Sequence, residues 1–227
     1  NGLVAANNPY PKPWAVRVRR SLTGWDGPVW YAGKSAIWIG AGAGLSAIKA
    51  MNPAHILYEL YTNRDWGRGM PSARLDLTSF AAAADKLYAE GFGLCLTWSR
   101  QGSIAEFQQV ILDHIGAACG TDSNGNISLK LIRDDYAIET LPLFDYETGL
   151  LGIDEEQIST PATATNEVIV NWHDPIKDED RQTAPVQNLG AIQAAGVRNS
   201  ATRDYPGLPT AALAARIALR DLRACSS

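Results

Sequence analysis

The sequence predicts an α+β protein, and three observations support that prediction. Apolar residues recur at helical spacing in three stretches between residues 52 and 120, and a capping residue precedes each stretch. The dipeptide Asn124-Gly125, set between alternating apolar residues, is the strongest short signal for a β-hairpin. Residues 167–172 are strong β formers. Residues 51–135 are therefore expected to form an α-α-β-α-β-β module, flanked by β-rich segments.

The first flanking segment, residues 1–50, combines strand and turn signals. Residues 15–19 alternate apolar and polar, and residues 29–39 are rich in Trp, Tyr and Ile, so both are expected to be strands. Asp26-Gly27-Pro28 is a turn signal between them. Because the chain begins with Asn1 rather than Met, we expect it to be cut from a longer protein and both flanking segments to be incomplete.

The three helices of the module have recognisable start signals. Asn52 is a predicted N-cap, and Pro53 follows at the first helical position, where its missing N–H costs nothing. Asp76 or Thr78 caps the second helix, and Ser103 opens the third with a glutamate three residues on, which makes a capping box. The predicted elements are helices over 53–63, 79–89 and 103–120, a buried strand over 92–98 and a hairpin over 121–133.

The second flanking segment, residues 136–227, is expected to be β-rich and to end in a helix. Its strongest signal is the run of β formers at 167–172, and Thr210 is a predicted helix cap near the end of the chain. The expected elements are an extended piece at 141–144, an acidic loop over 145–165 with a turn of helix at 154–158, a strand at 167–172, a polar loop over 174–188, a strand over 196–203 and a helix over 210–224.

Composition excludes several classes of function. With 46% hydrophobic and 19% charged residues the chain is ordinary globular material. No apolar run approaches the roughly 18–20 residues that a membrane span needs, so we expect none. No basic stripe dense enough for specific nucleic-acid binding is present, and no secretory signal opens the chain. Cys95, Cys119 and Cys225 are too few for a disulfide framework or a zinc site, so maturation in a reducing cytoplasm is expected.

The net charge of −4 conceals three blocks of opposite sign. Residues 1–74 carry +6, residues 75–180 carry −14 and residues 181–227 carry +4. The simplest interpretation is three solvated faces. Alternatively, copies of the molecule meet basic flank against acidic middle, or the acidic block lines a passage.

Two motifs imitate ligand sites but fail on spacing. A Gly-x-Gly-x-x-Ala run begins at Gly42, yet Asn52-Pro53 interrupts the helix that a dinucleotide-binding loop must lead into. Residues 122–126 begin like a calcium loop, but Ile127 and Arg133 occupy the positions that require Gly and Glu. A flexible glycine loop and a tight turn are therefore predicted at these places.

No catalytic, cofactor-binding or metal-ligating residue is predicted. His55, His114 and His173 lie in different elements without the motifs of metal or nucleophile sites. Asp174 with residues 178–180 forms an acidic cluster, for which a solvated loop is expected rather than a cation site. Aromatic residues crowd the N-terminal part, where they serve as strand core, subunit interface or a stacking surface for sugars. They are Trp14, Trp25, Trp30, Tyr31 and Trp38.

Residues 52–76, NPAHILYELYTNRDWGRGMPSARLD, followed by LTSFAAAADKLYAEG, resemble the tail tip attachment (host specificity) proteins of lambda-like siphophages and related prophages. That family shows an Asn-Pro-Ala opening, an apolar helix ending in a Leu-Thr-Asn-like triplet, an aromatic-Gly-x-Gly loop and an Asp-led helix. The matching residues are Asn52, Pro53, Ala54, Thr62, Asn63, Trp66, Gly67, Gly69 and Asp76. Tyr61 and Trp66 replace more typical residues. Further similarity in order and spacing extends the resemblance over residues 15–224.

The resemblance implies a structural role rather than an enzymatic one. It implies a baseplate-hub-like fold, with barrel-like β segments beside the α+β module, that assembles as a homotrimer at the distal end of the tail. Such a hub contacts other phage tail proteins and links the tail tube to fibre segments that reach the host receptor. No catalytic residue and no cofactor is associated with this region, and the protein would be part of the virion tail after assembly in the bacterial cytoplasm.

Two other functions stay open at this stage. A receptor- or carbohydrate-binding module of a tail fibre would use the aromatic residues between Trp14 and Trp38. A small α+β enzyme such as a wall hydrolase is a more distant alternative. Within the tail-tip interpretation, we expect part of the acidic region 134–180 to face the lumen, where Asp178, Glu179 and Asp180 would keep DNA from adhering.

Overall fold

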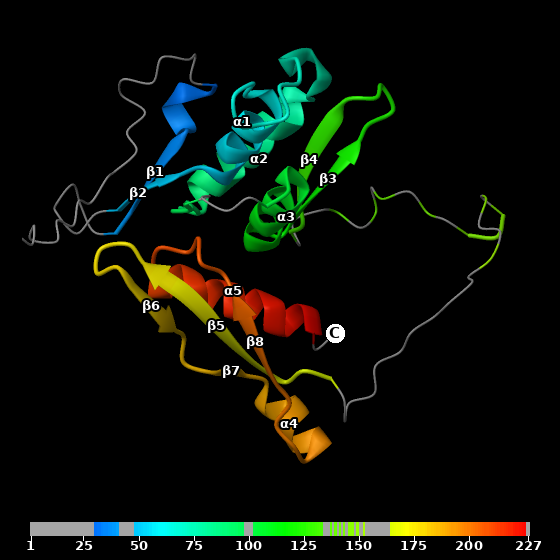
Figure 1. Ribbon diagram of the computed structural model, residues 1–227. Coiled ribbons are helices and arrows are strands. Elements are labelled where there is room, and N and C mark those ends of the chain that lie inside the picture. Colours follow the sequence, from blue (N-terminus) through cyan, green and yellow to red (C-terminus); the bar gives the residue numbers. More distant parts are fainter. Residues whose placement is uncertain are drawn as a thin grey trace, which may run out of the picture.

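The computed structural model describes residues 30–40, 48–97, 102–133 and 164–225, with isolated positions between 137 and 152. These residues form two lobes, which lie one above the other in Figure 1. We call residues 30–133 the first lobe and residues 164–225 the second lobe. The strand expected over 15–19, the turn at 26–28 and the helical turn at 154–158 lie outside the described residues.

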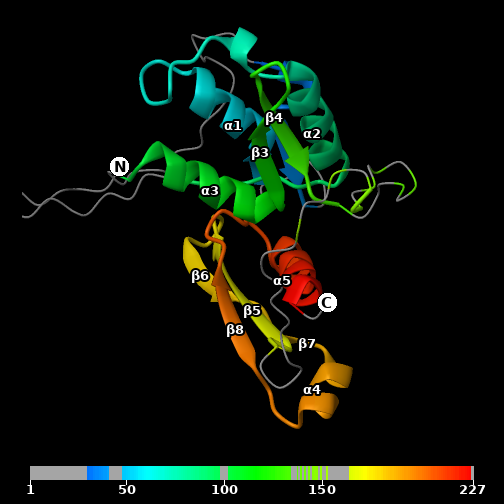
Figure 2. The ribbon, with the colours of Figure 1, turned by 90° about the vertical axis from the view of Figure 1, so that its right-hand side faces the viewer.

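The first lobe joins two β-hairpins to three helices, as Figure 2 shows from a second side. Strand β1 pairs antiparallel with β2, and β3 pairs antiparallel with β4. Its elements are the 3-10 turns η1 (Ala32–Lys34) and η2 (Ser72–Arg74), the strands β1 (Ala36–Ile39), β2 (Ile48–Met51), β3 (Ala117–Thr121) and β4 (Ile127–Leu131), and the helices α1 (Pro53–Thr62), α2 (Leu77–Ala89) and α3 (Ile104–Ile115).

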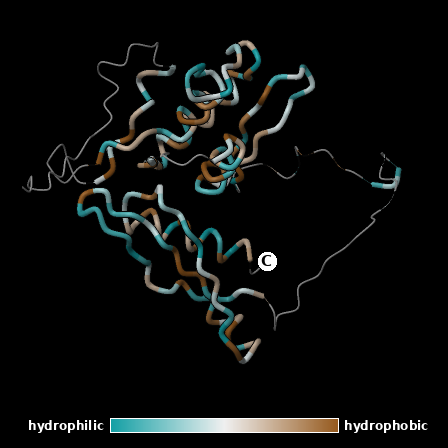
Figure 3. Tube along the Cα trace, viewed as in Figure 1, coloured by the Kyte–Doolittle hydropathy of each residue, from teal (hydrophilic) through white to brown (hydrophobic). Residues whose placement is uncertain are grey.

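The core of the first lobe comes from the apolar stripes of its three helices. Leu60 of α1, Phe80 and Leu87 of α2 and Ile111 of α3 are 0% exposed. Figure 3 colours the hydrophobic stretches of these elements brown. The backbone makes a close approach at Gly93, where an added Cβ would lie 2.5 Å from the Cβ of a residue in β2. Glycine thus lets the chain after α2 pass against the first hairpin.

The second lobe is an open sheet with one helix on its face. Strand β5 is central: β6 and β7 pair antiparallel along one edge and β8 pairs parallel along the other. Helix α4 stands at the far end of the lobe in Figures 1 and 2 and buries none of its residues. The elements are β5 (Glu167–Asp174), β6 (Glu179–Gln182), β7 (Val186–Gln187), α4 (Leu189–Ala195), β8 (Ser200–Asp204) and α5 (Ala211–Cys225).

Alternation along β5 decides which face of the sheet α5 covers. Val168, Val170 and Trp172 are buried, and successive residues of a strand point to opposite faces. α5 buries Leu213 and Ile217 from its own apolar stripe and makes its main contacts with β5. No helix among the described residues is long and apolar enough to cross a membrane.

A buried asparagine fixes the edge where β5 and β8 begin. Asn166 is 1% exposed, its Oδ1 accepts from the N–H of Asn199 at 2.8 Å, and its Nδ2 donates to the carbonyl of Val197 at 2.9 Å. Its own carbonyl accepts from Asn188, the N-cap of α4. One buried side chain therefore satisfies two backbone groups of the loop that leads into β8.

Several predicted elements are confirmed in kind and place. Helix α1 has Asn52 as its N-cap with Pro53 first, α2 is capped by Asp76 rather than Thr78, and the Ser103 capping box opens α3. The turn at residues 122–126 joins β3 to β4 in the expected hairpin. Strand β5 and helix α5 match their predictions to within two residues.

Other predictions were wrong for local reasons. Residues 92–97 form a single bridge, Leu94 to Met51, instead of a strand. Helix α3 ends at Ile115 because Gly116 takes a left-handed φ of 58°, so residues up to 121 form β3 rather than helix.

The remaining errors concern short elements with weak signals. Only residues 36–39 of the strand expected over 29–39 are a strand. Strands β6 and β7 lie in the stretch 174–188, which was expected to be a polar loop, and no particular element was predicted for the residues of β2 and α4. The described sheets are open, and they do not bear out the barrel-like form expected of the flanks.

Replacing Asn166 by alanine should lower the free energy of unfolding by about 1–3 kcal/mol, because two backbone groups would lose the partner that this buried amide supplies. Urea denaturation measures this change. Gln193→Ala, at an exposed position of α4, is the matched control and should change stability little. Equal stability of Asn166→Ala and the unaltered chain would contradict the role given to this amide.

Candidate functional site

The residues that carry the sequence resemblance surround α1 and its two ends. At the start of the helix, Asn52 is 0% exposed, and its Oδ1 accepts from the N–H of Ala54 at 3.1 Å. Its Nδ2 donates to the carbonyls of Lys34 and Ala84, at 3.0 and 2.9 Å. Asn52 thus caps α1 and also ties η1 to α2, while Pro53 supplies the fixed φ of the first turn.

At the other end of α1, the loop over residues 64–70 folds back onto the helix. The N–H groups of residues 68–70 donate at 2.8–2.9 Å to carbonyls of the last turn and of the C-cap, Asn63. The Oδ1 of Asn63 accepts from the N–H groups of Asp65 and Trp66. Side chain and loop together satisfy groups that a helix end leaves without partners.

Gly67 and Gly69 make that return of the chain possible. A Cβ on Gly67 would lie 2.5 Å from the carbonyl oxygen of Leu60 and 2.8 Å from that of Asn63. Gly69 has a φ of +62°, which a residue with a side chain rarely adopts. Thr62 joins the same end, since its hydroxyl donates to the carbonyl of Tyr58 at 2.9 Å.

Asp76 begins the next helix and attaches it to the hairpin. Its carboxylate accepts from the N–H groups of Thr78 and Ser79, and its own N–H donates to the carbonyl of Ile127 in β4 at 2.8 Å. The structure therefore brings Asn63, Gly67 and Gly69 together in one loop, whereas Asn52 and Asp76 serve other helix ends. All of these residues shape the backbone.

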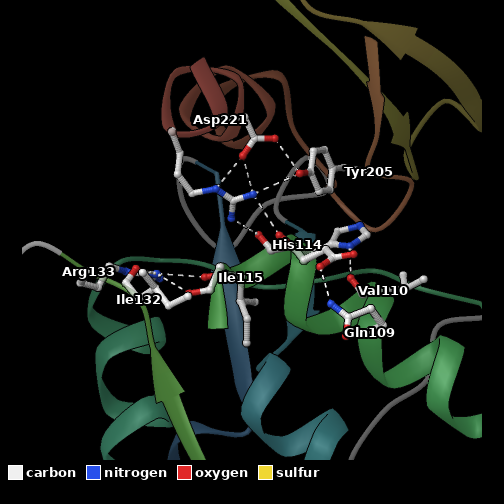
Figure 4. A network of polar contacts seen from close by, with 11 residues as sticks. Gln109, Val110, His114, Ile115, Ile132, Arg133, Tyr205 and Asp221 are labelled. Atoms are coloured by element: carbon white, nitrogen blue, oxygen red, sulfur yellow. Dashed lines mark hydrogen bonds and ion pairs between the residues drawn. The ribbon is translucent and has the colours of Figure 1, made fainter. Parts of the chain in front are cut away.

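A second set of polar contacts lies in the seam between the two lobes, drawn in Figure 4. At its centre is Gly207, which precedes α5. Its N–H donates to Nε2 of His114 at 3.1 Å, and its carbonyl accepts from the N–H of Cys95 at 2.9 Å. A Cβ here would lie 2.6 Å from Leu96 and 3.0 Å from His114, so the lobes approach this closely only because residue 207 is glycine.

Two arginines bind the C-terminal turn of α3. Arg220 of α5 donates to the carbonyls of His114 and Asp113, each at 2.9 Å. Arg133 donates from the first lobe to the carbonyl of Ile115 at 2.9 Å and forms a two-pronged pair with Glu90. Guanidinium groups suit this position because a helix C-terminus presents free carbonyls and a partial negative charge.

The second lobe also binds the C-terminal end of α2, and a carboxylate of α5 holds Arg220 in position. Arg216 donates to the carbonyl of Glu90 at 2.9 Å. Asp221 accepts from Nε of Arg220 at 2.9 Å and from the hydroxyl of Tyr205 at 2.6 Å. Arginines of α5 thus reach two helix ends of the first lobe.

His114 is neutral in this setting, and its tautomer is fixed. The side chain is 2% exposed, with Nδ1 2.6 Å from the carbonyl of Val110 and Nε2 accepting from Gly207. Nδ1 must therefore carry the proton. Burial, with the Arg220 charge adding to it, lowers the pKa of His114 to about 4. Nδ1 therefore bonds within α3, and Nε2 bonds across the seam.

An open groove of about 750 Å³ runs beside the seam. Val110 and Ile132 of the first lobe and Arg203, Ala224 and Cys225 of the second are among its lining residues. The side chains of Tyr205, Arg220 and Asp221 in its wall bond one another within the second lobe, and Arg220 also reaches the end of α3. Ile132 is 68% exposed and gives this surface an apolar element.

The other sequence-predicted polar residues lie apart from the seam. His173 in β5 has Nδ1 2.8 Å from Asp180 and Nε2 3.3 Å from Asp178, at the exposed turn into β6. His55 lies in α1, where its ring stacks on Trp30 at 6.2 Å. Within the described ranges, no three His, Cys, Asp or Glu side chains are arranged to hold a metal ion.

No protein-family model matches the chain, and no curated protein matches it either.

Sequence reasoning did not find the seam. Neither Arg220 nor Gly207 was singled out as a site residue. Each becomes important through residues more than 90 positions away. The one available signal was an arginine at an otherwise apolar helical position, which is too common to decide anything alone.

Gly67→Ala should destabilise the protein by about 1–3 kcal/mol, since the new methyl group would overlap carbonyl oxygens of α1. Chemical denaturation is the measurement. Gly120→Ala is the matched control: nothing lies within 4 Å of a Cβ there, and stability should hold. A Gly67→Ala protein as stable as the control would show that the loop can move away at no cost.

Gly207→Ala should lower the free energy of unfolding by a similar amount, about 1–3 kcal/mol, because the new methyl group would force Leu96 and His114 away from the chain before α5. Its effect can be followed through the urea midpoint. Gly190→Ala in α4, whose Cβ would meet only ordinary contacts, should leave the midpoint almost unchanged. Coinciding midpoints for the two variants would argue against close approach at Gly207.

Proposed function

We propose that this chain is a structural component of a bacteriophage or prophage tail tip. It would act by protein–protein assembly in a baseplate-hub-like domain that links the tail tube to the host-recognition fibre. In the complete protein it would form a homotrimer with other tail proteins around it, in the virion tail, after assembly in the host cytoplasm. It would act without catalysis or a cofactor.

One observation carries the proposal: the residues that resemble the tail-tip family fix the backbone at the two ends of α1 and at the start of α2. Asn52 joins three elements through its amide, and Gly67 and Gly69 let the loop close α1. Asp76 then links α2 to β4. Residues with this role fix the backbone, and the backbone positions the outer surfaces of the protein. A hub protein depends on such surfaces to bind its neighbours.

Exposed apolar side chains supply surfaces for neighbouring subunits. Leu189 on α4 is 71% exposed, Ile132 beside the groove 68% and Trp38 on β1 59%. Single exposed apolar residues are ordinary, but α4 buries nothing and carries no charge, so it has an apolar surface to offer. This supports assembly contacts without identifying which of them forms the trimer.

The decisive experiment places the chain in a particle. The protein, tagged in its native genome, should appear in purified tails, with gold-labelled antibody at the end distal to the head. Deleting its gene should give tails that lack a tip, and restoring the gene should repair them. Particles of normal form and infectivity without the chain, or label elsewhere on the tail, would refute the proposal.

The acidic turn between β5 and β6 gives a more specific test of the lumen hypothesis. The side chains of Asp178 and Asp180 are 90% and 94% exposed, so substitutions there should spare the fold. Reversing the charge of Asp178, Glu179 and Asp180 should impair DNA ejection and leave tail assembly intact. Charge reversal of the exposed Asp65 in the first lobe is the control, and normal ejection by the triple variant would contradict a lumen position.

A carbohydrate-binding module is the second candidate, and one described aromatic favours it. Trp30 packs on Tyr58 with ring centroids 4.7 Å apart and is a partly buried residue in contact with the core. Trp38, in contrast, is 59% exposed, and the Nζ of Lys49 lies 5.9 Å from the centroid of its ring. Trp14 and Trp25 lie outside the described residues. Glycan-array binding that disappears in Trp38→Ala and survives in Tyr88→Ala would favour this function.

A further inference from the structure

The contacts that join the two lobes depend on one titratable acceptor. His114 reaches across the seam from α3 through Nε2, which accepts the N–H of Gly207. Nδ1 already carries the proton that it donates to Val110. A second proton can therefore bind only at Nε2, where it would replace an acceptor with a donor that faces another donor.

The charged surroundings oppose that second proton as well. From α5, Arg220 places its guanidinium on the His114 carbonyl, while Asp221 is neutralised by Arg220 and by the hydroxyl of Tyr205. Arg203 of β8 acts on Tyr205 from the same side, and Arg133 binds the next carbonyl of α3.

The remaining neighbours do little to offset these cations. Asp113, adjacent on α3, is the carboxylate that favours protonation of His114, while burial and Arg220 oppose it. Cys95 of the facing segment is neutral, because burial raises its pKa to about 11. A cationic His114 would thus lie buried beside the Arg220 guanidinium, with a proton on Nε2 directed at the Gly207 N–H, while hydrogen bonds to the backbone of Val110 and Tyr205 favour the charged form.

The lobes share apolar packing as well as hydrogen bonds. Their buried residues form one hydrophobic cluster, and the ring of His114 lies edge-on to that of Tyr205 with centroids 5.1 Å apart. The broad contacts of the helices and strands lie within each lobe: α1 with α2 and α3 in the first, and α5 with β5 in the second. Across the seam, hydrogen bonds to helix ends, the pair of bonds at Gly207 and the packing of Leu96 add to that cluster. A charge on His114 would lie among these contacts, so we expect the seam to open before either lobe unfolds.

We propose that the seam is an acid-sensitive latch, which protonation of His114 releases so that the two lobes separate while each keeps its own fold. The proposal does not depend on the tail-tip function, because it concerns only contacts within the chain.

The sign and size follow from proton linkage. Burial lowers the pKa of His114 to about 4 in the closed form, and an accessible histidine titrates near its usual pKa of about 6.5. The open form then binds more protons between these values, so the closed form is lost as the pH falls through that window. From pH 7 to pH 4 the open-to-closed ratio should rise roughly a hundredfold.

The test is amide hydrogen exchange of the full chain followed by NMR between pH 7 and pH 4. Protection factors of the Gly207 and Cys95 amides should fall roughly a hundredfold, while those of Leu129 in β4 and Val170 in β5 stay high. In His114→Gln, which cannot gain a proton, the pH dependence at Gly207 should disappear. His173→Gln, which alters a partly exposed histidine of β5, should behave like the unaltered chain.

Three results would overturn the latch. Equal loss of protection at Gly207, Leu129 and Val170 would mean global unfolding rather than release. The same pH dependence in His114→Gln as in the unaltered chain would assign the effect to another group. If His114→Gln does not fold, the unaltered chain still decides, since its His114 ring signal must titrate together with the Gly207 amide; titration near 6.5 with Gly207 still protected would refute the proposal.

Discussion

The free carbonyl groups at the end of α3 are the constraint on which the joining of the two lobes depends. The helix stops at Ile115 because Gly116 turns left-handed, and the carbonyls before it need donors that α3 cannot supply. Arg133 meets this need from within the first lobe and Arg220 from the second. A local rule of helix termination thereby becomes a tertiary contact, and the position of α5 follows from it.

The same principle recurs along the chain. The loop after α1 returns to cap that helix, Asp76 caps α2, and Arg216 reaches the end of α2 from α5. The polar residues that first drew notice in the sequence are used at these helix ends, where they determine the course of the backbone. A protein organised in this way presents rigid surfaces, in keeping with a role in assembly.

Local signals decided how much of this fold could be predicted. Asn52-Pro53, the Ser103 capping box and Asn124-Gly125 act within a few residues, and all three produced the expected element. Residues 92–97 are apolar like a strand, but only Leu94 finds a pairing partner, because Gly93 lies against the first hairpin. Strand pairing depends on distant residues, so a segment's own pattern cannot settle it.

The residues of the candidate site also differ in how far they could be predicted from the sequence. The motif around α1 was visible because its members lie within 25 residues of one another, although their part in helix capping became clear only from the geometry. The seam joins residues about 90–130 positions apart, and a glycine, a histidine and arginines at such separations form no pattern. Their importance arises from close approach, which a sequence does not record.

The order of the elements has a consequence for synthesis on the ribosome. The first lobe emerges long before α5, so its helix ends at Glu90 and His114 wait for the arginines that later bind them. Through that interval water, or a neighbouring nascent chain, must solvate those carbonyls. Docking of α5 is thus a late step of folding. A translation product that ends before α5 would leave the two lobes unjoined.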